Sequence, residues 1–389
     1  MNEYYAEETD VVEDDEVGGV GSEEAPFKKK KKKKGAIRSL LELGRQKGAS
    51  DLHLAEGVPP VFRVNGELVK MSDTPPLTKD KVYNMINAIL TEEQKRIVKE
   101  ELQLDSALEL EDGRYRVSVY TTRKGLSASL RLIPDKIKGF KELGLPESLE
   151  KLMQLSDGLL LVTGPTGCGK STTLASMIDW INEHRQAHII TIEDPIEFVH
   201  QHKRCMINQR EIGAHTESFA SALRSALRQD PDIILVGEMR DLETISTALT
   251  AAETGHLVLA TLHTKSAAKT IDRLIDAFPA HQQNQVRIQL SETIQAIIAQ
   301  SLLPLKEGNG RVPAVEILVA TPAVRNTIRE MKTHQIPSII QTSGRDGMQS
   351  LAQSLRGLLH EDKISKAEML KRFTDKEIFA LAGGYYQEE

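Results

Sequence analysis

Residues 159–172 of this 389-residue chain read Leu159-Leu160-Leu161-Val162-Thr163-Gly164-Pro165-Thr166-Gly167-Cys168-Gly169-Lys170-Ser171-Thr172. The apolar run that opens this stretch has the length and composition of a buried strand. In the loop that follows, three glycines allow tight turns whose N–H groups point at an anion, and Lys170 adds a cation. A helix that begins at Thr172 would add its positive dipole end. The stretch therefore predicts a strand, a phosphate-binding loop and a helix, in that order.

We expect this loop to bind ATP, because its pattern matches one that holds nucleotide phosphates. The hydroxyl of Ser171 is in the position that such loops use to bind Mg²⁺. The predicted ATP-binding residues of the stretch are Gly164, Pro165, Thr166, Gly167, Cys168, Gly169, Lys170, Ser171 and Thr172.

Three further apolar runs follow, at residues 188–193, 232–236 and 257–262. Such runs are typical of parallel strands that are buried on both faces. Helical patterns at 218–228 and 242–252 separate them, which predicts a doubly wound α/β domain over residues 148–389. After Pro313 we expect mostly helix. The amphipathic stretches there lie at 323–332, 347–360 and 366–373.

The residues before this domain predict a small α+β domain at 35–137, joined to it by a linker at 138–147. Residues 37–43 have apolar positions at helical spacing, and 51–54 alternate as a strand does. Asn65-Gly66 is a hairpin signal between the short alternating segments 61–64 and 67–69. We expect a helical stretch at 79–102 and then two strands, at 114–120 and 128–132.

The first 34 residues have strongly segregated charge. Residues 1–27 hold ten acidic residues and no Lys or Arg, and residues 28–34 are seven consecutive lysines. Such a segment buries too little apolar surface to offset the entropy of ordering, so we predict a disordered tail. A solvated spacer is favoured over a segment that binds anionic lipid or nucleic acid. The rest of the chain is nearly neutral, which argues against a dedicated nucleic-acid surface.

Composition also limits where the protein works. No segment approaches eighteen consecutive apolar residues, and the acidic N-terminus does not resemble a signal peptide. Two cysteines, Cys168 and Cys205, provide neither a disulfide framework nor a four-ligand zinc site. We therefore expect a cytoplasmic protein.

A carboxylate follows the apolar run at 232–236, where Gly237 and Glu238 come next. Phosphate-loop enzymes hold Mg²⁺ or orient the attacking water at such a strand end, and many carry a Mg²⁺-binding Asp where this chain has Gly237. We therefore predict that Glu238 polarises the water. The alternative is an ordinary surface glutamate.

Three acids, Glu193, Asp194 and Glu197, lie at the end of the run at 188–193. Because they repel one another, we expect a cation nearby and predict that Glu193 and Glu197 assist catalysis and that Asp194 binds Mg²⁺. A solvated turn opened by Pro195 is the alternative.

Two histidines flank the run at 257–262. His263 lies at the strand end where open α/β sheets bind ligands, so we predict that it senses the γ-phosphate. His256 is a further candidate ATP contact. An ordinary structural role is the alternative for both, and a metal pair is excluded because no third ligand lies at suitable spacing.

Taken together, these motifs resemble those of the secretion/type IV pilus ATPase superfamily. In order, they are similar to its Walker A, Asp box, Walker B and His box, at residues 164–171, 193–197, 237–241 and 254–264. Within the superfamily, the chain resembles PilT-type pilus retraction ATPases over residues 35–375. The likeness includes residues 48–54 and a helix motif at 323–330, from which Val324 and Thr327 depart.

The resemblance implies a homohexamer in which a PAS-like N-terminal domain packs on a RecA-like ATPase domain. It implies that arginines of the N-terminal domain reach the γ-phosphate, with Arg116 and Arg131 as the best candidates and Arg123 as a weaker one. The helix with Arg325 and Arg329 would couple hydrolysis to pilus retraction, or else be a surface helix. The implied partners are an inner-membrane platform protein and an accessory retraction ATPase, with the ring peripheral to the inner membrane.

Several alternatives remain. Pilus assembly and type II secretion ATPases share the chemistry, but they have a larger N-terminal region and usually a tetracysteine zinc element. A PilU-like accessory paralogue is poorly separated by sequence. A DNA-handling RecA-like protein predicts a basic groove and stacking aromatics, and neither is visible. A non-enzymatic scaffold would lack Lys170 or Glu238, and both are present.

Overall fold

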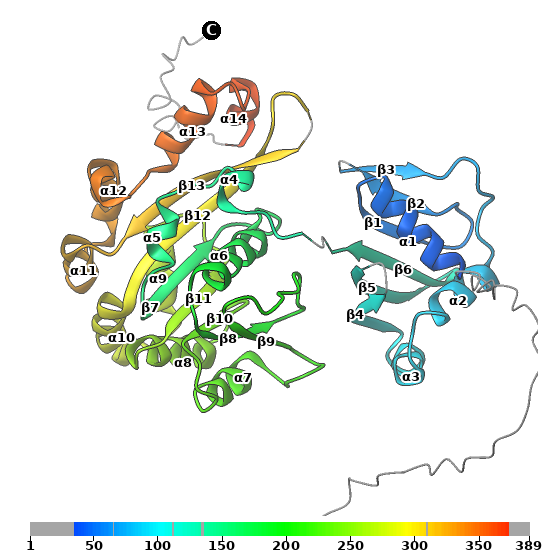
Figure 1. The fold of residues 1–389 in the computed structure, drawn as a ribbon, viewed down its shortest axis with the longest axis horizontal. Coiled ribbons are helices and arrows are strands. Elements are labelled where there is room, and N and C mark those ends of the chain that lie inside the picture. The colour runs from blue at the N-terminus through cyan, green and yellow to red at the C-terminus, as the bar shows by residue number, and fades with distance from the viewer. Residues whose placement is uncertain (1–34, 65, 111–112, 134–135, 309, 373–389) are drawn as a thin grey trace, which may run out of the picture.

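The computed structural model describes residues 35–372, apart from residues 65, 111–112, 134–135 and 309. The predicted tail at 1–34 and the end of the helix predicted to reach Phe373 lie outside the described residues. Figure 1 shows two sheets in separate domains, the larger of which has helices on both faces. Within the described part of the chain, no helix has the length and apolar character needed to cross a bilayer.

The N-terminal domain is a six-stranded antiparallel sheet in the order β3-β2-β1-β6-β5-β4. Its strands are β1 Ala49–Leu54, β2 Val61–Val64, β3 Glu67–Lys70, β4 Gln103–Leu110, β5 Gly113–Thr122 and β6 Gly125–Leu132, and its helices are α1 Ala36–Gln46, α2 Lys79–Asn87 and α3 Glu92–Glu101. Ile37, Leu52 and Tyr115 are fully buried in one core between sheet and helices. The pairing of Val64 with Glu67 confirms the predicted hairpin.

The helical stretch predicted at 79–102 is confirmed, but it is interrupted. The structure has two helices there, because Thr91 starts a new one with a capping box to Gln94. Leu102 then adopts a left-handed conformation, and β4 begins immediately after it. The strand β4 was not predicted, because its side chains are mostly half-buried and do not alternate cleanly.

The C-terminal domain has a seven-stranded sheet in the order β13-β12-β7-β11-β10-β8-β9. Every pair is parallel except β12 with β13. The strands are β7 Gly158–Thr163, β8 His188–Glu193, β9 Met206–Glu211, β10 Ile233–Val236, β11 Leu257–Leu262, β12 Ile294–Pro304 and β13 Arg311–Val319. All residues of β7, β10 and β11 are buried, which confirms the predicted α/β core.

Helices cover both faces of this sheet, and each face has its own apolar cluster. They are α4 Phe140–Leu143, α5 Leu149–Leu152, α6 Lys170–His184, α7 Phe219–Ala226, α8 Leu242–Glu253, α9 Ala267–Asp276 and α10 Ala280–Thr293. The segment predicted as a linker at 138–147 contains α4, and its Phe140 and Leu145 are buried in one of these clusters.

The described chain after Pro313 is mostly helical, as predicted, although β13 first continues to Val319. This strand closes the sheet by pairing with β12 over nine residue pairs, and neither strand was predicted. The chain then forms α11 Pro322–Arg329, α12 Ile336–Thr342, α13 Leu351–His360 and α14 Lys366–Arg372. The short parallel strand β9 was also missed.

The guanidinium of Arg325 in α11 is turned inward. It donates to the carbonyl oxygens of Ser291 and Glu292 at 2.8 and 2.6 Å and to Oε1 of Gln295 at 3.0 Å. These groups lie where α10 ends and β12 begins. A cation at the last carbonyls of a helix also interacts favourably with the helix dipole. Arg325 therefore stabilises the junction between α10, α11 and β12, whereas Arg329 of the same helix is exposed.

We predict that Arg325→Ala lowers the free energy of unfolding by about 1–3 kcal/mol, because the carbonyl oxygens at the end of α10 lose a charged donor. Urea denaturation followed by circular dichroism would measure this change. Arg329→Ala, from the exposed face of α11, is the matched control and should change stability little. Equal losses in the two variants would contradict the assignment.

Candidate active site

The parallel strands of the C-terminal sheet bring four predicted motifs to one edge. Strands β7, β8, β10 and β11 are neighbours and parallel, so their carboxyl ends meet on the same side. The phosphate loop, the acidic run, Glu238 and His263 each follow one of these ends. This is the edge at which open α/β sheets bind ligands.

The side chain of Gln300 in β12 supports the phosphate loop through two hydrogen bonds. Its side-chain Nε2 donates to the carbonyl oxygen of Cys168 at 2.6 Å, and its Oε1 accepts from the hydroxyl of Thr173 at 2.9 Å. Gly164 has φ +144°, and a Cβ there would lie 2.3 Å from the carbonyl oxygen of Gln300. The loop therefore needs glycine at this position. Gln300 was not predicted as a site residue, and its position in the mostly apolar strand β12 was the only local signal for it.

Lys170 begins α6 at the end of the loop, and its side chain is buried. Its Nζ donates to the carbonyl oxygens of Gly164 and Pro165 at 2.9 and 3.3 Å. The thiol of Cys168 is buried too, and burial raises its pKa above the ordinary value. Cys168 thus contributes its backbone to the loop and keeps a neutral side chain.

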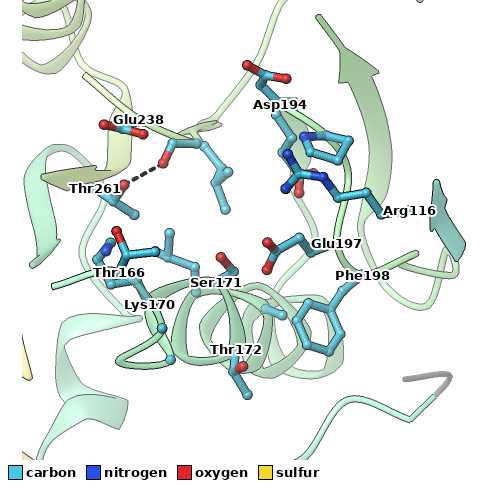
Figure 2. A pocket seen from close by; sticks show the side chains of 18 of the residues that line it. Arg116, Thr166, Lys170, Ser171, Thr172, Asp194, Glu197, Phe198, Glu238 and Thr261 are labelled. Carbon is cyan, nitrogen blue, oxygen red and sulfur yellow. Dashed lines mark hydrogen bonds between the residues drawn. The ribbon is translucent and has the colours of Figure 1, made fainter. Parts of the chain in front are cut away.

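A cavity of about 690 Å³ lies above the loop and is drawn in Figure 2. Most of the predicted site residues line it. They are Arg116, Arg131, Thr166, Gly167, Gly169, Lys170, Ser171, Thr172, Glu193, Asp194, Glu197, Glu238 and His263.

The structure does not bring His256 to this cavity. His256 precedes β11, whereas His263 follows the same strand, so the two histidines lie at opposite edges of the sheet. The Nδ1 atom of His256 lies 3.0 Å from the carbonyl oxygen of Ala251. The predicted contact with ATP is therefore corrected to a structural role at the end of α8. Gly164, Pro165 and Cys168 also lie outside the lining, and they shape the loop instead.

The carboxylate of Glu238 contacts the side chains of Arg240 and His263. Its Oε2 lies 2.7 Å from Nη2 of Arg240, and its Oε1 lies 3.1 Å from Nε2 of His263. Burial raises the pKa of this carboxyl, but the hydrogen bonds and charges of Arg240 and His263 outweigh burial and lower its pKa below the ordinary value. Glu238 is therefore a carboxylate of fixed orientation at neutral pH.

His263 also faces the phosphate loop, since its Nδ1 lies 3.5 Å from the hydroxyl oxygen of Thr166. One imidazole thus connects Glu238 with the loop. Gly237, before Glu238, allows a close strand contact: a Cβ there would lie 3.1 Å from the carbonyl oxygen of Ile192. The hydroxyl of Thr261 donates to the carbonyl oxygen of Gly237 at 2.5 Å (Figure 2).

The three acids at the end of β8 differ in environment. Burial raises the pKa of Glu193 above its ordinary value. Hydrogen bonds from the side chains of Thr191 at 2.6 Å and Gln209 at 3.1 Å lower this pKa, but they do not outweigh burial. Glu197 is half-buried, and in Figure 2 its carboxylate points toward Ser171. Asp194 is exposed at the outer part of the cavity.

The cavity contains side-chain oxygen atoms of the kind that bind Mg²⁺. The described part of the chain has no cluster of three or more His, Cys, Asp or Glu residues that would cage a metal. Mg²⁺ does not require such a cluster, because it keeps several waters and binds one or two carboxylates together with substrate phosphates. The hydroxyl of Ser171 with the carboxylate of Glu197 or Asp194 provides that kind of donor set.

Two arginines reach the cavity from the N-terminal domain. Arg116 of β5 and Arg131 of β6 are directly paired across the sheet, so their side chains share one face. The Nε atom of Arg131 donates to Oδ1 of Asp51 at 3.0 Å. Arg123 is exposed in the turn between β5 and β6 and does not line the cavity.

Further cavity residues were not predicted as site residues. Arg240 and Arg311 add positive charge, and Phe198 adds an apolar wall. Arg240 lies within the motif at 237–241, where its spacing of two residues from Glu238 was an available signal. Arg311 begins the missed strand β13, and nothing in its local sequence distinguishes it.

The chain is similar to known proteins over most of its length. The family described as "Type II/IV secretion system protein" matches residues 29–371. A type IV pilus retraction ATPase, PilT of Pseudomonas aeruginosa, is 52% identical over 85% of this chain and 96% of its own length. The type IV pilus ATPase PilU of the same organism is 41% identical over 86% and 87%. A crystal structure of the pilus retraction motor PilT with bound ADP superposes with a TM-score of 0.82, at 46% identity over 88% of this chain and 98% of that one.

We predict that Glu238→Gln binds ATP but reduces steady-state hydrolysis by about 10²–10⁴-fold, because the amide cannot accept a proton from the attacking water. Phosphate release would measure turnover, and a fluorescent ATP analogue would measure binding. The control is Glu243→Gln, an exposed glutamate near the start of α8, which should hydrolyse ATP normally. Undiminished turnover in Glu238→Gln would refute the role.

Proposed function

This chain belongs to the family of type II/IV secretion system proteins, and on that premise we propose that it is an ATP-hydrolysing motor that drives type IV pilus retraction. The observation that carries the proposal is the cavity, which is lined by the phosphate loop of one domain and the arginines of another. Such a site couples the nucleotide to the relative position of two domains. The similarity to a retraction ATPase extends over both of these domains.

The side chains have complementary roles in the proposed hydrolysis. The loop N–H groups and Lys170 hold the phosphates, and Glu238 orients the water and accepts its proton. His263 responds to the γ-phosphate, because it already contacts both Glu238 and the loop. Mg²⁺, bound through Ser171 and a nearby carboxylate, would neutralise phosphate charge.

Arg116 and Arg131 would stabilise the charge that develops on the transferred phosphate. Because they belong to the N-terminal sheet, this stabilisation requires that domain to close over the loop. Loss of the γ-phosphate then removes the contact that favours closure, so each hydrolysis cycle moves one domain against the other.

We propose that six copies assemble into a ring, with PAS-like N-terminal and RecA-like C-terminal domains in each subunit. The ring would act on an inner-membrane platform protein at the cytoplasmic face, as a peripheral complex. An accessory retraction ATPase is a further proposed partner, and nucleic acid is not. The accessory role itself is the second candidate function, favoured by the identity to PilU.

Deletion of the gene should leave cells with excess pili and without twitching, because pili extend but do not retract. Fluorescently labelled pili imaged in live cells would measure retraction. Wild-type complementation should restore it, and the Glu238→Gln variant should not. Loss of pili would indicate assembly. Continued pilus retraction in the deletion strain would favour the accessory role.

We predict that Arg116→Ala lowers kcat roughly 10³-fold, as expected for an arginine that stabilises a phosphoryl-transfer transition state. Nucleotide affinity should change little, because the loop that binds the phosphates belongs to the other domain. Steady-state hydrolysis and equilibrium ATP binding would separate the two effects. Arg123→Ala, in the exposed turn after β5, is the control and should be fully active.

A further inference from the structure

One ion pair connects the two domains beside the cavity. Nη2 of Arg114, in β5 of the N-terminal sheet, lies 2.6 Å from Oε2 of Glu211, at the end of β9 in the C-terminal sheet. Both side chains are largely buried, with exposed fractions of 16% and 8%. Removing one partner of such a pair leaves the other charge buried without compensation, so a single substitution at either position should disturb the contact between the domains.

Glu211 also contacts the acidic loop that follows β8, at residues 194–197. The same Oε2 atom accepts a hydrogen bond from the backbone N–H of Ile196 at 3.1 Å. Ile196 lies between Asp194 and Glu197, both of which line the cavity. One carboxylate oxygen thus contacts the N-terminal domain and the loop with the predicted Mg²⁺ ligand.

Arg114 is also held in place by contacts within the N-terminal domain. Side chains alternate along a strand, so Arg114 and Arg116 share one face of β5. The carbonyl oxygen of Arg114 accepts from the Nη2 atom of Arg45 in α1 at 3.3 Å and from the N–H of Ile133 at 3.0 Å. These two hydrogen bonds hold the backbone of β5 in place two residues before Arg116.

We propose that Arg114 and Glu211 are positioning residues for ATP hydrolysis: their ion pair orients the N-terminal sheet so that Arg116 enters the cavity, and it fixes the acidic loop at the same time. This inference rests on the proposed ATPase function. Neither residue lines the cavity, so neither touches the nucleotide, and both act through Arg116 and the loop.

The test uses the full-length protein and ATP hydrolysis measured across ATP concentrations. Arg114→Gln and Glu211→Gln should each lower kcat about tenfold and change KM less than twofold. Glutamine at 211 retains an oxygen that can accept from Ile196, so that variant removes the ion pair with least disturbance. Arg114→Lys keeps the charge and should recover most of kcat.

Two comparisons separate positioning from a general structural effect. In the Arg116→Ala background, Arg114→Gln should cost little further activity, because residues that act as a unit are not additive. Arg96→Gln removes an exposed ion pair with Glu93 on α3 and is the matched control, expected to leave kcat unchanged. Thermal unfolding would confirm that each variant is folded.

The proposal is overturned if Arg114→Gln retains wild-type kcat, or if its loss of activity is fully additive with that of Arg116→Ala. An inactive wild-type protein would instead refute the ATPase function on which the inference rests. The two failures are therefore distinguishable in the same assay.

Discussion

The functional edge of this protein depends on the parallel register of four neighbouring strands. Val236 of β10 pairs with Ile192 of β8 on one side and Ala260 of β11 on the other, so all three strands end at nearly the same level. Each loop that follows then opens toward the same cavity. A slip of one residue would turn buried side chains to the opposite face, which a sheet covered on both sides resists.

Two partly buried glutamates of the site differ in the direction of their pKa shifts. Arg240 and His263 keep Glu238 ionised, whereas burial favours the protonated form of Glu193. Environments that separate two carboxyl pKa values commonly distinguish their chemical roles. A lowered pKa keeps Glu238 in the ionised form that can orient the attacking water and accept its proton, and phosphoryl transfer depends strongly on such positioning.

The parts that sequence reasoning could predict were those with strong local signals. The apolar runs of β7, β10 and β11 and the phosphate loop between β7 and α6 are examples. The strands β4, β9, β12 and β13 gave weaker patterns, because their burial depends on neighbours distant in the chain. Gln300 holds the phosphate loop from 132 positions away in the sequence. His256 and His263 lie at opposite ends of β11. Their separation becomes apparent only when the bounds of that strand are known.

Contacts across the two domains are the part that local sequence could not provide. Arg114 and Arg116 have the same alternating spacing as any exposed strand pair, and Glu211 ends a strand that was not predicted. Only the fold joins them through an oxygen shared with the N–H of Ile196. Because that oxygen serves both domains, the N-terminal sheet cannot move away without changing the contacts of the acidic loop. The position of the N-terminal sheet and the arrangement of the acidic loop are therefore physically linked.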